Sequence, residues 1–155
     1  MSTHVAEVRW ELSGEDFCAG KYSREHVWSF DGGVTVPASP SPHVVREPYS
    51  NPAHVDPEEA FVAAIASCHL LTFLYLASRR GIVVTRYVDA AVGKLTKNER
   101  GVPWVSKVVL RPQIEYADGS RPSAELEAEL HHGAHEQCFI ANSVKTEIVV
   151  EGVTS

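Results

Sequence analysis

Cysteine is the residue type with the most versatile chemistry in this chain, which contains Cys18, Cys68 and Cys138. An odd and sparse set of cysteines does not resemble a disulfide scaffold. The first twelve residues carry no apolar stretch of the kind found in secretory signals, so we expect a reducing, cytoplasmic environment. In that environment a cysteine pair indicates redox chemistry, metal binding or plain core packing.

Cys68 lies in the middle of an uncharged apolar segment, residues 60–77. Taken alone, such a cysteine is most often a small core residue. Burial raises the pKa of a thiol, so a reactive Cys68 needs a cation beside it. Arg24 is the arginine that strand alternation places among aromatic side chains, unless it snorkels from a strand end. His69 points about 100° away from Cys68 on a helix, and its role stays open.

Cys138 stands at the end of a second predicted helix, where the partial negative charge of the helix disfavours a thiolate. That position suits a resolving thiol better than an attacking one. Cys18 falls in a segment bounded by Gly14 and Gly20, which predicts a turn. We interpret Cys18 as an incidental thiol.

A zinc site is the alternative use of these residues. His131 and His135 share a helix face, Cys138 follows three residues later, and Cys68 could complete a tetrahedral set. The spacing matches no closed zinc motif, so we predict no metal. Histidines near solvent at a helix end are the simpler interpretation of His131 and His132.

The elements that must position these residues follow from periodicity and end signals. Alternation predicts strands, a capping box at 56–59 opens the long apolar helix, and Ser123 caps the second helix. The expected order is strand 5–12, strand 22–30, a proline-rich loop 37–57, helix 57–80, strand 83–97, strand 104–116, helix 123–137 and strand 144–151. This order predicts one α+β domain over residues 1–155, with antiparallel sheets around a buried helix.

Composition excludes several classes of function. The net charge is −6 and no run of Lys or Arg is present, so nucleic acid and acidic membrane surfaces are not expected partners. Segment 60–77 reaches the lower limit for spanning a bilayer, but polar side chains dilute it. We therefore expect a helix buried in a soluble domain or dimer. The chain lacks the GxSxG, GxxxxGK[ST], GxGxxG and HExxH motifs.

Taken together, four strings resemble the OsmC/Ohr family, the osmotically inducible and organic-hydroperoxide-resistance thiol peroxidases. They are Asp-Pro-Glu-Glu at 56–59, Ala-Ser-Cys-His at 66–69, Cys138 with Asn-Ser-Val-Lys-Thr-Glu at 142–147, and Tyr-Ser-Arg-x-His-x-Trp at 22–28. The last string is similar to the OsmC-like branch. Two departures are Asp56 in place of the family's usual Asn and Phe139 where many members have proline.

The resemblance implies an intertwined homodimer, in which antiparallel sheets enclose two long central helices. It implies a cofactor-free, cysteine-based peroxidase that reduces organic hydroperoxides, with Cys68 peroxidatic and Cys138 resolving through a disulfide. Glu58 matches the acidic partner of the family's arginine, which is Arg24 or, as a rival, Arg46. By family analogy the reductant is a dithiol on a lipoylated protein.

Helix geometry bears on this assignment. Glu58 and Cys68 are ten residues apart on one predicted helix, about 15 Å along its axis. If both serve one site, either Glu58 comes from a partner chain or the helix is interrupted, and the first possibility favours a dimer. A zinc-binding protein, a non-catalytic family member that binds a small apolar ligand, and a purely structural dimer stay open as alternatives. A contribution from His69 or His135 also stays open.

Overall fold

The computed structural model describes residues 1–14 and 16–153. The chain forms two compact units, an N-terminal unit, Met1–Ala60, and a C-terminal unit, Phe61–Ser155. Helix α1, Pro57–Arg79, begins in the first and continues into the second.

The N-terminal unit contains a three-stranded antiparallel sheet in the order β1, Ala6–Arg9, β2, His26–Phe30, and β3, Thr35–Ala38. A short 3₁₀ turn, η1, Phe17–Ala19, lies between β1 and β2. The predicted strands 5–12 and 22–30 are thus shorter in the structure. Strand β3 is an unpredicted element, because Pro37 indicated a loop; Pro37 is tolerated since β3 is an edge strand.

The start of α1 confirms the predicted capping box. The Asp56 carboxylate accepts the backbone N–H of Glu59 at 2.7 Å, and the Glu59 carboxylate accepts the backbone N–H of Asp56 at 3.0 Å. The helix ends before Gly81, which takes the left-handed conformation with φ +71°. Because α1 runs without interruption from Pro57 to Arg79, Glu58 and Cys68 stand on the same continuous helix.

Each of the two long predicted strands is divided in two. Strands β4, Val84–Asp89, and β7, Pro112–Tyr116, form one antiparallel pair, while β5, Val92–Lys97, β6, Pro103–Leu110, and β8, Glu147–Val150, form a second sheet. The division falls where the Arg111 backbone N–H donates to the Asp89 carboxylate at 2.7 Å. Strand β8 pairs with β6 in parallel, which corrects the expectation of purely antiparallel pairing.

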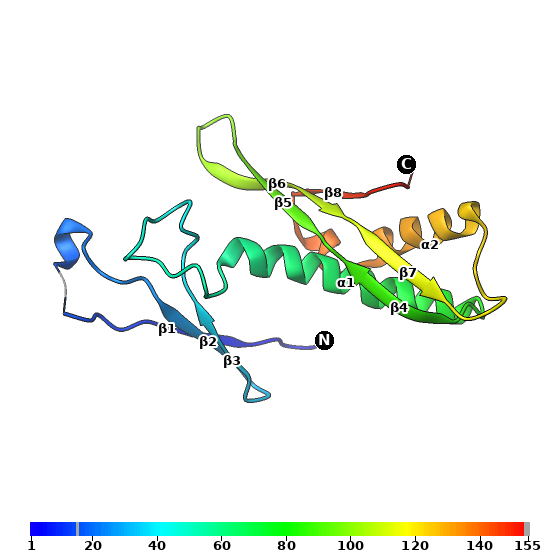
Figure 1. The fold of residues 1–155 in the computed structure, drawn as a ribbon, viewed down its shortest axis with the longest axis horizontal. Coiled ribbons are helices and arrows are strands. Elements are labelled where there is room, and N and C mark those ends of the chain that lie inside the picture. The colour runs from blue at the N-terminus through cyan, green and yellow to red at the C-terminus, as the bar shows by residue number, and fades with distance from the viewer. Residues whose placement is uncertain (15, 154–155) are drawn as a thin grey trace. The chain divides into compact units, whose positions relative to one another are not determined.

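Helix α2, Ala124–Gln137, is capped by Ser123 as predicted, and the 3₁₀ turn η2, Ala141–Ser143, follows it. Figure 1 shows the backbone of the C-terminal unit, in which β4 and β7 run side by side. Two apolar clusters hold this unit together. In one, Phe73 and Ala77 of α1 pack on Leu130 and Ala134 of α2. In the other, residues of α1 pack on β6 and β8. Helix α1 therefore packs on both the strands and α2, and the middle of α1 lies near the end of α2.

The opposite face of α1 is exposed among the described residues. Leu71 is 64% exposed and Tyr75 is 58% exposed, while Ile65 and Phe73 are buried. Among the described residues α1 is the one helix whose length and composition would allow it to cross a membrane. A core or interface helix of a soluble protein has the same length and composition.

Candidate functional site

The structure brings together the two thiols that the sequence singled out. Cys68 lies midway along α1 and Cys138 caps the C-terminus of α2, and the two thiols are close enough for Cys68 to raise the pKa of Cys138. Both cysteines are free thiols. The side chain of Cys138 is buried, whereas Cys68 is only partly buried. This thiol contact places Cys68 and Cys138 at the junction of α1 and α2.

The surroundings of Cys138 act on its thiol in opposite directions. Burial raises the pKa of Cys138, and the neighbouring Cys68 thiol raises it further. The backbone N–H of Ala141 donates to the Cys138 sulfur at 3.3 Å and lowers the pKa in part. Cys138 is therefore protonated at rest, yet a donor is already in place for its thiolate.

One helical position beyond Cys68, a second contact joins α1 to α2. His69 and His131 are stacked with an interplanar angle of 8°, and the Nε2 atom of His69 lies 3.0 Å from the Nδ1 atom of His131. Both residues are buried, at 1% and 3% exposure. Burial, together with smaller contributions from His131 and His135, lowers the pKa of His69 to about 4. The prediction that His131 lies near solvent is wrong, because His131 is on the face of α2 that packs against α1.

The arrangement does not support the zinc alternative. His131 is hydrogen-bonded to His69, while His135 is exposed. Within residues 1–14 and 16–153, no group of three or more His, Cys, Asp or Glu side chains could hold a metal ion. His132 is exposed, as expected, with its Nε2 atom 3.2 Å from the Glu136 carboxylate.

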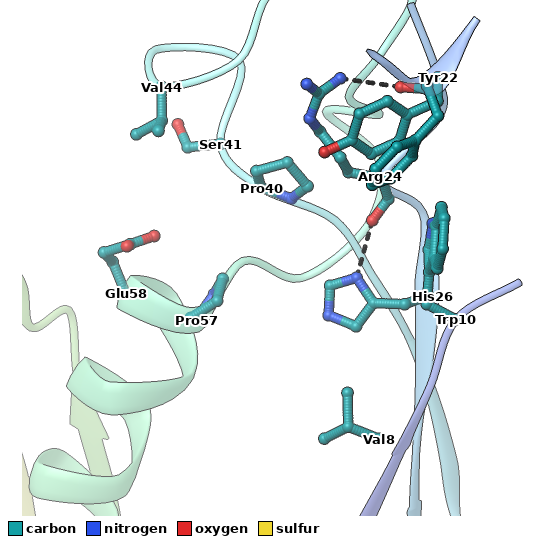
Figure 2. A pocket seen from close by; sticks show the side chains of 11 residues that line it. Val8, Trp10, Tyr22, Arg24, His26, Pro40, Ser41, Val44, Pro57 and Glu58 are labelled. Atoms are coloured by element: carbon teal, nitrogen blue, oxygen red, sulfur yellow. Dashed lines mark hydrogen bonds between the residues drawn. The ribbon is translucent and has the colours of Figure 1, made fainter. Parts of the chain in front are cut away.

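Arg24 lines a pocket of about 490 Å³ in the N-terminal unit (Figure 2). The walls are mostly apolar and aromatic, and they include Trp10, Phe17, Tyr22, Pro40 and Val44. The prediction that Arg24 projects among aromatic side chains is confirmed, since its guanidinium carbon lies 3.9 Å from the centre of the Tyr22 ring.

Glu58 lines the same pocket as Arg24 (Figure 2). Burial raises the pKa of Glu58, and the neighbouring carboxylates add to the rise. No ion pair joins Glu58 to Arg24 in the described part of the chain; Arg24 instead donates to the carbonyl oxygens of Tyr22 at 2.8 Å and Gly20 at 3.2 Å. The expected holding of Arg24 by Glu58 is therefore not present within a single chain. Arg46, the rival arginine, is exposed and does not line this pocket.

Two features of the C-terminal unit were not predicted from the sequence. The His69–His131 hydrogen bond could have been found from the spacing of His131, Ala134 and Cys138, which places all three on one face of α2. The Ala141 donor has no sequence signal, because any residue supplies a backbone N–H. Cys18 is exposed within η1.

Comparison with known proteins gives a consistent result. Residues 50–152 match the family model described as OsmC-like protein. An OsmC-like protein of unknown function from Vibrio cholerae has a similar structure, with 53% sequence identity, a TM-score of 0.94, and coverage of 97% of this chain and 99% of that chain. No curated protein matches.

Two more distant structures have the same fold. An organic hydroperoxide resistance protein OsmC from Legionella pneumophila is 18% identical with a TM-score of 0.67, over 97% of this chain and 94% of that chain. An organic hydroperoxide resistance protein from Elizabethkingia anophelis with bound thiocyanate is 18% identical with a TM-score of 0.69, over the same shares of 97% and 94%. At this identity they show the fold alone.

Proposed function

Because the chain belongs to the OsmC-like family, we propose that it is a cysteine-based peroxidase that reduces organic hydroperoxides to alcohols. Proteins with the same fold include organic hydroperoxide resistance proteins. The observation that carries the proposal is the thiol contact between Cys68 and Cys138, which joins two helices far apart in the sequence.

In the proposed reaction the Cys68 thiolate attacks the terminal oxygen of the hydroperoxide. The O–O bond breaks, Cys68 becomes a sulfenic acid, and the leaving alkoxide takes a proton to become the alcohol. The Cys138 sulfur then attacks the Cys68 sulfur, water leaves, and a disulfide forms. An external dithiol, by family analogy on a lipoylated protein, is oxidised to its own disulfide and restores both thiols.

The two cysteines divide these roles by access. Cys68 is partly exposed, so a substrate oxygen can reach it, whereas Cys138 is enclosed by its own chain. Arg24, in a mostly apolar pocket, is the proposed guanidinium that stabilises the Cys68 thiolate and orients the peroxide. An apolar pocket also favours an alkyl or aryl hydroperoxide over hydrogen peroxide.

A homodimer would complete this site. Because α1 is continuous, Glu58 and Cys68 of one chain are separated by about 15 Å along the helix. We therefore propose that the Glu58 that serves a given Cys68 comes from a second copy of the chain. The uncovered side chains of Leu71, Tyr75 and Phe139 support such an interface. Sedimentation velocity tests it, with a dimer expected for the wild type and a monomer for Leu71→Asp.

We propose a cytoplasmic protein that acts on a small hydroperoxide without nucleic acid or membrane as a partner. The alternative, a family member that binds a small apolar ligand and does no chemistry, shares the pocket but makes no use of two adjacent thiols.

A single-turnover assay tests the proposed function. Reduced protein is mixed with one equivalent of cumene hydroperoxide, and residual peroxide is followed against time. Wild type and Cys18→Ser should consume peroxide at similar rates, because Cys18 has no part in the proposed chemistry. Cys68→Ser should fall to the rate of buffer alone. Peroxide consumption by Cys68→Ser at the wild-type rate would show that the mechanism is wrong.

A further inference from the structure

The two sulfurs of a Cys68–Cys138 disulfide would offer an incoming reductant two different targets. Cys138 is 1% exposed, because its own chain covers it, while Cys68 is partly exposed. A thiolate must approach a disulfide sulfur from the side opposite the bond that breaks, so access decides which sulfur is attacked. Access favours Cys68.

The turn after α2 is arranged for the complementary role. When a reductant attacks the Cys68 sulfur, the electron pair of the broken bond stays on the Cys138 sulfur. The backbone N–H of Ala141, 3.3 Å from that sulfur, points at the atom where the negative charge develops. A hydrogen bond to a charged acceptor is stronger than one to a neutral acceptor, so this donor acts mostly on the thiolate.

One side chain fixes that turn. The amide nitrogen of Asn142 donates to the carbonyl oxygens of Glu136 and Cys138, each at 2.9 Å. The backbone N–H of Asn142 also donates to the Cys138 carbonyl at 3.1 Å. The Asn142 side chain thus ties the turn to the last carbonyls of α2 and holds the Ala141 N–H against the Cys138 sulfur. Asn142 itself is exposed, so its position is not explained by core packing.

We propose that the external dithiol enters at Cys68, that Cys138 leaves as the thiolate, and that Asn142 is the positioning residue that prepares Cys138 to leave. The inference rests on the proposed function. One reductant thiolate forms a mixed disulfide with the Cys68 sulfur as the Cys68–Cys138 bond breaks, and Cys138 takes a proton. The second reductant thiol, once deprotonated, then displaces the Cys68 thiolate, so the dithiol is oxidised and both cysteines are reduced.

The first experiment locates the attack on the wild-type protein. The disulfide is formed beforehand with diamide, so the experiment does not depend on peroxidase activity. Glutathione is then added, the mixture is quenched with acid within seconds, and the adduct is located by peptide mapping. The glutathione adduct is expected at Cys68, and an adduct mainly at Cys138 would overturn the proposal.

The second experiment tests Asn142 with a matched control in the same turn. Ser143 is also exposed and donates to the Phe139 carbonyl at 2.7 Å, but it makes no contact with Cys138. With the disulfide preformed, Asn142→Ala should slow reduction by dithiothreitol about threefold to tenfold, whereas Ser143→Ala should match the wild type.

A readout specific to the Cys138 sulfur separates positioning from general stability. In the Cys18→Ser, Cys68→Ser background Cys138 is the one thiol left, so the pH dependence of thiolate absorbance in the ultraviolet gives the pKa of Cys138. Asn142→Ala should raise this pKa by about one unit, since the Ala141 donor is no longer held in place. Ser143→Ala should leave the pKa unchanged. Equal pKa values and equal reduction rates for Asn142→Ala and wild type would refute the role of Asn142.

Discussion

Two neighbouring contacts join α1 to α2. The thiol contact joins Cys68 to Cys138 and the imidazole contact joins His69 to His131, and the two differ in access to solvent and in polarity. Cys68 and His69 are neighbours on α1, and each meets a residue of α2, Cys138 and His131 respectively. Both imidazoles are buried, at 1% and 3% exposure. The thiol contact has one buried member and one that solvent reaches. The side chains of Cys68 and His69 leave α1 about 100° apart, so solvent reaches the first and not the second.

Burial, more than residue type, separates the roles of these two contacts between α1 and α2. Histidine is the usual proton carrier near neutral pH, but burial lowers the pKa of His69 to about 4, so the ring is neutral there. The imidazole contact then stabilises the packing of α1 on α2, while the thiol contact carries the proposed chemistry. Each of the following predictions changes one side of this comparison.

Loss of the resolving thiol should have the largest effect. Cys138→Ser should still react once with organic hydroperoxide, because Cys68 remains, but no disulfide can protect the sulfenic acid. Excess peroxide should then oxidise Cys68 to sulfinic acid, a gain of two oxygens in intact mass. Turnover with a dithiol should fall at least about tenfold. An unmodified Cys68 after excess peroxide would contradict the assigned roles.

Loss of an imidazole should affect stability before chemistry. His131→Ala removes a buried ring and leaves His69 without its hydrogen-bond partner, so we expect the free energy of unfolding to fall by about 2–4 kcal/mol. The exposed neighbour supplies the control, since His132→Ala should change stability by less than about 0.5 kcal/mol. Urea unfolding measures both, and equal values would remove the structural role of the imidazole contact.

Acid should also lower the free energy of unfolding, through the imidazole contact. The pKa of His69 is about 4 in the folded protein against 6.5 for a free imidazole, so only the unfolded chain binds this proton as pH falls from 6.5 to 4. Stability is therefore fully present above pH 6.5 and declines by up to about 3 kcal/mol towards pH 4 from this group.

His131 and His135 are the titratable groups that face His69, and Glu127 favours the charged form of His131. Urea unfolding of wild type and His69→Gln at several pH values isolates the contribution of His69. The variant should have a shallower pH dependence between pH 6.5 and 4.5. Parallel curves for the two proteins would contradict a buried, neutral His69.

Gly133 lies on α2 between His131 and Cys138, and its substitution by alanine should have the smallest effect on stability. A methyl group there would lie 3.1 Å from the Leu76 side chain, so Leu76 would have to shift by a few tenths of an ångström. Alanine also favours the helix by about 1 kcal/mol over glycine. We expect Gly133→Ala to change stability by less than about 1 kcal/mol, measured by urea unfolding. A loss of several kcal/mol would mean that the helices are packed more rigidly than the contacts indicate.

Local patterns predicted the helices well. The capping box at Asp56 and Glu59 and the Ser123 cap are short-range hydrogen bonds, so the sequence fixes both helix starts without tertiary information. Strand limits were harder. The breaks between β4 and β5 and between β6 and β7 depend on which neighbour each half pairs with, as does the parallel pairing of β8.

The candidate site divides in the same way. Cys68, Cys138 and the aromatic surroundings of Arg24 could be predicted from residue type, spacing and alternation. The burial of His131 and the Ala141 donor depend on how α2 is rotated against α1 and on the path of the turn after it. A sequence does not encode these in any short pattern.

The most direct test of the central claim is the intact mass of the reduced protein before and after one equivalent of cumene hydroperoxide, followed by peptide mapping. A Cys68–Cys138 disulfide replaces two thiol hydrogens, so we predict a loss of about 2 Da, with the bond mapped to these two cysteines and Cys18 still free for alkylation. An unchanged mass, with three thiols still open to alkylation after unfolding, would contradict the account.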